Sequence, residues 1–185
     1  MSASPFKLRR YERSAMSDFF HSLLYQLLSA GYGETTARDI ARGFSMPRCV
    51  TMRVNTLKSD VEYIKGRLDE VGIGYIGVPW YGDALIMPKV REDDIRALDI
   101  YEDGKIYLQN LSSMIPPLLL EAGEGDCVLD MTAAPGGKCA QIAALTDNKA
   151  QLTACEKDKI RTERLKYNIA RQGVRAYVMN ADATK

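Results

Sequence analysis

Residues 127–139 are the segment that most constrains the fold of this chain. They read Cys-Val-Leu-Asp-Met-Thr-Ala-Ala-Pro-Gly-Gly-Lys-Cys, so a short apolar run changes abruptly into small residues. Residues 141–145 then resume with helical character. The segment predicts a buried strand, a tight loop and a helix. Small side chains let a ligand approach the backbone, and N–H groups at a helix start favour its polar groups. We therefore expect a nucleotide-like cofactor.

Two better-known glycine motifs are excluded by their context. A phosphate-binding P-loop needs Ser or Thr after Gly-Lys, but Cys139 follows Gly137-Lys138, and Thr132 stands where the first glycine belongs. The stretch Gly-Ile-Gly-Tyr-Ile-Gly at 72–77 matches the dinucleotide pattern letter for letter. That motif needs a strand before it and a helix after it, whereas here a predicted helix precedes and an extended segment follows. We interpret 72–77 as a helix end leading into a strand.

The residues after the loop favour an open parallel sheet. We predict a helix over 138–145, a strand over 150–155 that ends at Glu156, and a helix over 157–172 with Ile160, Leu165 and Ile169 facing inward. A third strand over 175–180 ends near Asp182. This alternation predicts the first half of a Rossmann-like, doubly wound α/β sheet. Ligands bind at the carboxyl ends of such strands, and an acid placed like Glu156 commonly takes ribose hydroxyls.

The loop resembles that of a known family. The run Ala-Ala-Pro-Gly-Gly-Lys at 133–138 is similar to the cofactor loop of the Nol/Nop/Sun (Sun/Fmu-like) family of S-adenosylmethionine-dependent RNA cytosine-5 methyltransferases. The stretch Ile-Tyr-Leu-Gln-Asn-Leu-Ser-Ser-Met at 106–114 also resembles the approach to that domain. The resemblance covers roughly residues 46–185. It departs from the family pattern at Thr132, where cysteine is usual, and at Cys139, where threonine is usual.

The resemblance implies a cofactor, S-adenosyl-L-methionine, and a set of binding residues. The loop would hold the methionine and ribose part through Thr132, Ala133, Ala134, Pro135, Gly136, Gly137 and Lys138. Glu156 would take the ribose hydroxyls, and Arg161 would support that acid or the adenosine. Asp182 would lie by the adenine amino group.

The resemblance also implies the reaction. Enzymes of this type add a cysteine thiolate to carbon 6 of cytosine, which makes carbon 5 nucleophilic toward the methyl donor. The family's two cysteines, one after proline and one after threonine, follow the fourth strand, and this sequence ends at Lys185 before reaching them. We expect the complete protein to methylate carbon 5 of cytosine in RNA, and the 185-residue chain at most to bind cofactor. The alternatives are a non-catalytic RNA-binding or assembly protein of the same fold, and a methyltransferase acting on another base or on protein.

The cysteines suggest no metal site. The four cysteines form no Cys-x-x-Cys pair, and the single histidine, His21, lacks obvious partners, so no structural zinc is expected. Cys139 begins a helix, where a thiol pKa can fall, but we do not favour a nucleophilic role because it would face the cofactor loop rather than a base bound opposite it. Cys49, Cys127 and Cys155 are interpreted as small apolar filler. Cysteine usage and the lack of a secretory pattern predict a cytoplasmic protein without a membrane span, although the basic start leaves an organellar address open.

Charge is distributed unevenly along the chain. Lys plus Arg outnumber Asp plus Glu by 9 to 4 in residues 1–58, are outnumbered 6 to 13 in 59–125, and lead 10 to 7 in 126–185. The basic first segment suits contact with RNA phosphates, with ribosomal or transfer RNA as the expected partner. The cations that would serve this role are Lys7, Arg9, Arg10, Arg13, Arg38, Arg42, Arg48 and Arg53. The alternative is an ordinary solvated helical face.

The pattern divides the chain into three predicted domains. Residues 1–45 form a helical region with helices over 14–30 and 34–42, and the first has a wide apolar face that includes Phe19 and Phe20. Residues 46–104 form a small ferredoxin-like or RNA-recognition-like α/β unit, with strands over 48–54, 74–78 and 84–87, a helix capped by Ser59 and another over 93–98. Residues 105–185 form a partial methyltransferase domain. Tyr75, Trp80 and Tyr81 could stack on bases if exposed, but we favour packing roles. The complete protein is expected to be a monomer.

Overall fold

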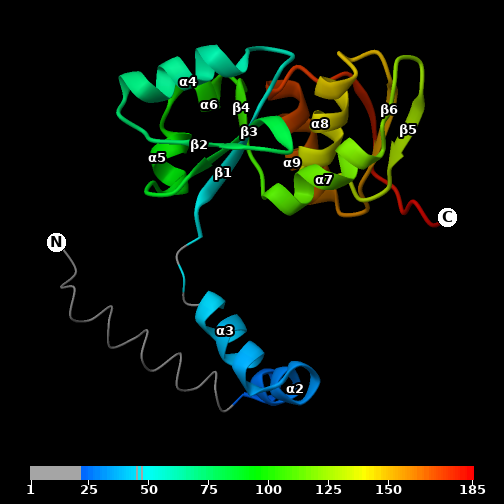
Figure 1. The fold of residues 1–185 in the computed structure, drawn as a ribbon. Coiled ribbons are helices and arrows are strands. Elements are labelled where there is room, and N and C mark those ends of the chain that lie inside the picture. Colours follow the sequence, from blue (N-terminus) through cyan, green and yellow to red (C-terminus); the bar gives the residue numbers. More distant parts are fainter. Residues whose placement is uncertain (1–21, 45, 47) are drawn as a thin grey trace. The chain divides into compact units, whose positions relative to one another are not determined.

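The computed structural model describes residues 22–44, 46 and 48–185 (Figure 1). The predicted roles of Phe19, Phe20, His21 and the cations at positions 7, 9, 10 and 13 fall outside these residues. The chain divides after Arg48 into two compact units, and the second spans Cys49–Lys185. Within the described residues, no helix combines the length and apolar character that a bilayer crossing requires.

The first unit contains a pair of packed helices, α2 (Leu23–Tyr32) and α3 (Glu34–Phe44). The side chain of Ser22 caps α2 by accepting a hydrogen bond from the Tyr25 N–H at 3.2 Å. Gly33, with a φ of +80°, makes the turn between the helices, a conformation that glycine adopts without strain. Tyr25 packs with Ala37 and Ala41 of α3. The predicted helix pair is therefore confirmed from Ser22 onward.

The second unit begins with a four-stranded antiparallel sheet. Its elements are β1 (Val50–Val54), α4 (Val61–Glu70), β2 (Ile76–Val78), β3 (Tyr81–Met87), α5 (Glu92–Arg96), α6 (Asp99–Glu102) and β4 (Ile106–Leu108). The strand order β2-β3-β1-β4 is that of a ferredoxin-like unit, as the sequence predicted. Strand β4 pairs with β1 in the register Arg53↔Tyr107, so this sheet contains residues on both sides of position 104. The three predicted domain limits stay predictions.

The two faces of this sheet are covered by different elements. Val50, Met52 and Val54 alternate along β1 and pack under the helices with Ile64, Leu68, Ile95 and Ile100. On the other face, Ala84 and Ile86 of β3 pack against Met114 of α7 (Leu111–Leu119). Asp60, and not Ser59 as predicted, caps α4, because its Oδ1 accepts the Tyr63 N–H at 2.8 Å. The Ser59 N–H instead donates to the Asn55 carbonyl within the preceding turn.

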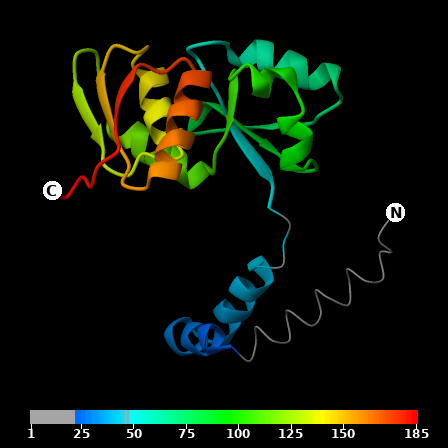
Figure 2. The same cartoon turned by 180° about the vertical axis from the view of Figure 1, so that it is seen from behind.

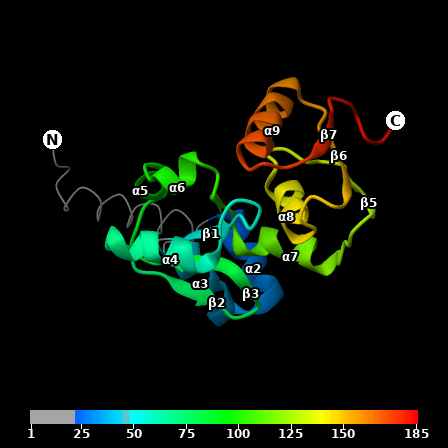
Figure 3. The same cartoon turned by 90° about the horizontal axis from the view of Figure 1, so that it is seen from above.

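The remaining residues form a parallel sheet of β5 (Cys127–Asp130), β6 (Gln151–Cys155) and β7 (Ala176–Met179), in that order. Helices α8 (Gly137–Leu145) and α9 (Lys159–Arg171) connect the strands and cover the same face of the sheet (Figure 3). Their residues Ile142, Leu165 and Ile169 pack with Leu152 and other side chains of that face. The predicted order of strands and helices is confirmed.

One prediction on α9 is wrong. Ile160 was expected to face inward, but it is 76% exposed. The buried side of α9 is formed by Thr162, Leu165 and Ile169, which follow one another at intervals of three and four residues. Ile160 lies two residues before Thr162, and a helix turns by about 100° per residue, so Ile160 points to the opposite side.

A buried arginine of the antiparallel sheet is hydrogen-bonded to the end of α9. Arg53 is fully buried, and its Nη2 donates to Gln172 Oε1 at 3.2 Å while its Nε donates to Gln109 Oε1 at 3.5 Å. Gln109 Nε2 in turn donates to Gln141 Oε1 at 3.0 Å. Burial lowers the pKa of the Arg53 guanidinium. The expectation that Arg53 neutralises phosphates is therefore wrong, because its guanidinium is buried.

Candidate cofactor-binding site

The small-residue loop lies at the carboxyl end of β5, as predicted. The Ala133 N–H donates to the Cys155 carbonyl at 2.9 Å, which ties the loop to the end of β6. The Gly136 N–H then donates to the Ala133 carbonyl at 2.7 Å, and Gly136 turns into α8 with a φ of +108°. The loop thus runs across the ends of two neighbouring parallel strands, which is where open α/β sheets bind ligands.

The two loop glycines are required by packing inside the protein. A Cβ atom at Gly136 would lie 3.1 Å from Ile169 and Leu165 of α9. A Cβ atom at Gly137 would lie 2.9 Å from Cε1 of Tyr107 on β4. The sequence suggested that bare glycines admit a ligand, but at these two positions the space of the missing side chain is filled by α9 and β4.

The start of α8 presents backbone N–H groups without a side-chain partner. Gly136 occupies the N-cap position and supplies no capping side chain. The first N–H groups of a helix have no partner within the helix, and they carry partial positive charge. Thr132 and Lys138 are exposed beside them. The arrangement suits a ligand with a carboxylate or other electron-rich groups.

Glu156 and Arg161 meet the loop from the next strand and helix. Glu156 follows β6 and is only 5% exposed, and its Oε1 accepts the Asp158 N–H at 3.0 Å. Arg161 Nη1 lies 3.3 Å from Glu156 Oε2, within ion-pair distance but without hydrogen-bond geometry. Arg161 Nη2 donates to the Ala134 carbonyl at 2.9 Å. The structure therefore brings Glu156, Arg161 and the loop together, and it leaves one buried carboxylate oxygen of Glu156 without a hydrogen bond.

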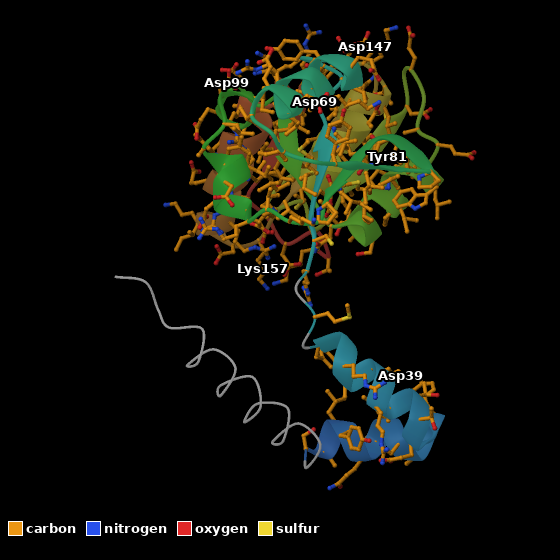
Figure 4. The ribbon with its side chains drawn as sticks, turned by 60° about the vertical axis from the view of Figure 1, so that its left-hand side comes forward. Asp39, Asp69, Tyr81, Asp99, Asp147 and Lys157 are labelled. Carbon is orange, nitrogen blue, oxygen red and sulfur yellow. The ribbon has the colours of Figure 1, made fainter. Side chains whose placement is uncertain are left out.

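Asp182 lies beyond the end of β7. The neighbouring Ala181 N–H donates to the Glu156 carbonyl at 3.2 Å, which connects this segment to the end of β6. Asp182 Oδ1 accepts from the Thr184 hydroxyl at 2.7 Å, and Oδ2 accepts from the Nζ of Lys157 at 3.0 Å; Lys157 is labelled in Figure 4. These hydrogen bonds, with that from Thr184 the largest, lower the pKa of Asp182 to about 2.

Asp130 is a site residue that the sequence reasoning did not assign. Its Oδ1 accepts the Thr132 N–H at 3.2 Å, whereas its buried Oδ2 has no hydrogen-bond partner among the described residues. Burial raises the pKa of this carboxyl group, the loop N–H and Lys138 lower it, and nearby Glu156 raises it. A signal was present in the sequence, because an acid directly after an apolar strand marks the ligand-binding edge of a parallel sheet.

Comparison with known proteins places this site in a family. Residues 117–185 match the family model described as 16S rRNA methyltransferase RsmB/F. The chain belongs to this family. It is 34% identical over 137 residues to the ribosomal RNA small subunit methyltransferase F of Shewanella sp. (strain ANA-3), which covers 73% of this chain and 28% of that protein. It is 39% identical over 102 residues to the tRNA (cytosine(72)-C(5))-methyltransferase of Pyrococcus horikoshii, covering 55% and 26%.

A solved structure agrees with this assignment. A methyltransferase homolog protein from Pyrococcus horikoshii superposes with a TM-score of 0.74 at 32% identity, over 82% of this chain and 50% of the other. The Rossmann-like α/β fold is thus shared with this methyltransferase homolog. The chain spans about a quarter of the length of the curated relatives it matches.

The cysteines of this RsmB/F chain differ in accessibility. Cys139 is buried, and burial, with a smaller effect of Asp130, raises the pKa of its thiol to about 12. A raised pKa does not favour a nucleophilic role for this thiol. Cys155 is buried as expected. Cys49 and Cys127 are exposed, so their interpretation as apolar filler is wrong. On β5, Val128 packs under the helices, so the adjacent Cys127 points to the opposite face.

The described residues of the RsmB/F chain also bear on metal binding and on base stacking by Tyr75, Trp80 and Tyr81. Among the described residues, no three His, Cys, Asp or Glu side chains are grouped closely enough to hold a metal ion. Tyr81 on β3, labelled in Figure 4, is buried, which confirms packing as its role. Trp80 remains half exposed, and the Tyr75 hydroxyl donates to Asp69 Oδ2 at 3.3 Å.

Proposed function

We propose that the full-length protein is an RNA methyltransferase that uses S-adenosyl-L-methionine and transfers a methyl group to carbon 5 of cytosine. The observation that carries the proposal is the meeting of Glu156, Arg161 and the Ala134 carbonyl at the carboxyl ends of β5 and β6. The named activities of the two curated relatives, one on ribosomal RNA and one on transfer RNA, support the substrate class. The cofactor supplies an electrophilic methyl group on a sulfonium centre.

The described residues fit the cofactor at several positions. Glu156 has a buried carboxylate oxygen without a hydrogen bond, and two ribose hydroxyls would supply the missing donors. Asp130 has another such oxygen, which suits the ammonium of the methionine part. Residues 132–138, with the uncapped start of α8, would hold the methionine carboxylate and ribose. Arg161 would hold Glu156 in place, and Asp182 would accept from the adenine amino group.

We also propose that the amino-terminal region contacts RNA, but without Arg53. Arg38 and Arg42 lie on α3, where exposed ion pairs link them to Glu34 at 3.3 Å and Asp39 at 3.2 Å. Such exposed pairs are weak and exchange readily with phosphate. Arg48 is exposed, whereas Arg53 is withdrawn from this role by its burial. Ribosomal or transfer RNA in the cytoplasm, acted on by a monomer, is the setting we propose.

The test uses the full-length protein with methyl-labelled cofactor and in vitro transcribed ribosomal and transfer RNA. Label in RNA that digests to 5-methylcytidine is the expected result. Label on another base, or on protein, would replace the cytosine assignment. Binding of RNA without any transfer by the intact chain would instead favour the non-catalytic RNA-binding or assembly protein of the same fold.

A further inference from the structure

Four side chains on the second unit form an alternating arrangement of arginine and tyrosine, here called the Arg–Tyr cluster: Arg96, Tyr101, Tyr167 and Arg171. Arg171 Cζ lies 4.3 Å from the ring centroid of Tyr101 and 5.8 Å from that of Tyr167. Arg96 Cζ lies 5.3 Å from the Tyr101 centroid. The cluster joins α5 and α6 of the ferredoxin-like unit to α9. These helices lie on the side of the molecule seen in Figure 2.

The two guanidinium groups share one ring although their charges repel. Arg171 has no carboxylate within ion-pair distance in the part of the chain that the structure describes. Arg96 pairs with Glu92 at 3.0 Å, but both side chains are largely exposed, so this pair is weak. The Tyr101 ring attracts both guanidinium groups. Arg96 also donates to the Tyr101 hydroxyl and to Glu92, and Arg171 Nε is buried without a hydrogen-bond partner among the described residues. Arg171 therefore lacks an anionic partner that would satisfy its guanidinium.

The surface continues along α9. Ile160, Arg164 and Tyr167 are exposed, and with Arg171 they follow one another at intervals of four, three and four residues. Residues with this spacing lie on one face of a helix. Tyr167 is 62% exposed, which is high for an aromatic ring. This face leads from the cluster toward the end of α9 that follows Glu156, so it connects the cluster with the candidate cofactor site.

Most carboxylates of the acidic helices beside the cluster are paired with a cation of their own. Asp94 pairs with Arg91 at 3.1 Å, Asp99 pairs with Arg67 at 3.0 Å, and Asp103 pairs with Lys105 at 2.9 Å. Each of these carboxylates is compensated locally by its own cation. Asp93 and Glu102 lack such a partner among the described residues. On α9, Arg164 and Arg171 likewise have no ion-pair partner among the described residues, so this surface holds two unpaired acids and two unpaired arginines.

The sheet face that RNA-recognition domains use is covered in this chain. Such domains stack bases on aromatic residues of their sheet. Here that face carries Arg53, Ala84 and Tyr107, all buried, with α7 and the methyltransferase half packed over it. An RNA strand in contact with this unit must therefore use another surface.

We propose that the Arg–Tyr cluster and the exposed face of α9 bind a single-stranded segment of the RNA substrate, which rests on the function proposed above. The guanidinium groups of Arg96 and Arg171 would form forked hydrogen bonds with phosphates. The ring of Tyr167 would stack with a base, a contact that tolerates any sequence. The surface would thus guide the strand that leads to the reacting cytosine.

The test measures binding of a fluorescent oligouridylate to the full-length protein over a series of salt concentrations. Arg171→Gln should reduce the slope of log Kd against log salt by about 0.7 to 1, the value for one lost phosphate contact. Tyr167→Ala should weaken binding by about 5- to 150-fold, the loss of one stacked base. Arg91→Gln removes an exposed arginine from the same region and serves as the matched control, with an unchanged slope. Cofactor affinity and thermal midpoint should stay at the wild-type values in all three.

Each outcome decides the proposal. Slopes and affinities of Arg171→Gln and Tyr167→Ala equal to those of Arg91→Gln overturn it. If Arg171→Gln lowers the thermal midpoint, Arg171→Lys is the second variant, because it keeps the charge. A KM for RNA that still rises in Arg171→Lys at unchanged kcat supports the forked contact. An unchanged KM overturns it. If the wild-type protein methylates RNA while the variants bind like the control, the proposed RNA surface is wrong and the proposed function stands. A wild-type protein that binds oligouridylate through this surface without methylating RNA contradicts the proposed function alone.

Discussion

A Cβ atom at Gly137 would lie 2.9 Å from Cε1 of Tyr107, so the first residue of α8 is in van der Waals contact with strand β4 of the other sheet. Tyr107 is paired with Arg53, and Gln109, two residues further on, bonds Gln141 of α8. The cofactor loop is therefore supported from behind by the ferredoxin-like unit. Both sheets lie in the same compact unit.

Gly137→Ala should destabilise the protein by about 1–3 kcal/mol, because the added methyl group overpacks the contact with Tyr107. Gly66→Ala is the matched control, since Gly66 lies inside α4 and nothing stands within 4 Å of its added Cβ. That control should be stabilised by up to about 1 kcal/mol through helix propensity. Urea unfolding at constant m-value measures both. Equal effects of the two substitutions would show that Tyr107 yields without cost.

Arg53→Met should lower the free energy of unfolding by about 1–3 kcal/mol, because the side-chain oxygens of Gln109 and Gln172 lose a buried donor. The salt dependence of RNA affinity should not change, since the guanidinium does not reach solvent. Exposed Arg175→Met should change stability by no more than about 0.5 kcal/mol. A weaker salt dependence of RNA affinity in Arg53→Met would show that this arginine contacts RNA.

Cys49 and Cys127 should react with iodoacetamide at pH 8, and Cys139 should not. The Cys139 thiol is buried and its pKa of about 12 leaves almost no thiolate at that pH. Mass spectrometry of tryptic peptides after timed labelling gives the order of reaction. Rapid labelling of Cys139 in the folded protein would mean that the start of α8 opens or activates the thiol.

The Asp182 carboxylate should contribute stability only when it is ionised. Its pKa is lowered to about 2 in the folded protein, while an unfolded aspartate titrates at about 3.9. The contribution is therefore fully present above pH 4 and is lost as the pH falls toward 2. The difference in urea midpoint between the wild type and Asp182→Asn should shrink between pH 6 and pH 3. A constant difference over that range would show that the Thr184 and Lys157 contacts do not depend on the charge.

The sequence predicts the local order of helices and strands well, but it does not predict the contacts between them. The small-residue loop, the helix after it and the acid at the end of β6 follow from patterns within a few residues, and all three were found where predicted. The burial of Arg53 could not be predicted, because its partners Gln109 and Gln172 are 56 and 119 residues away in the chain.

Local ambiguity accounts for the other errors. Ile160 was assigned to the core by its apolar character alone, although its spacing from Leu165 places it on the outer side of α9. Cys127 lies on a strand, where alternate residues face opposite sides, and the choice of side depends on where α8 and α9 pack. Ser59 and Asp60 are both good helix caps, and the structure selects the second.

The most direct test of the cofactor site is titration calorimetry of S-adenosyl-L-methionine with the full-length protein and two variants. Glu156→Gln removes the negative charge that would accept hydrogen bonds from the ribose hydroxyls. Glu163→Gln removes an exposed carboxylate from the next helix and is the control. We predict that Glu156→Gln weakens binding by about 1–3 kcal/mol while Glu163→Gln leaves it unchanged. Equal affinity of the wild type and Glu156→Gln would contradict the assignment of this site.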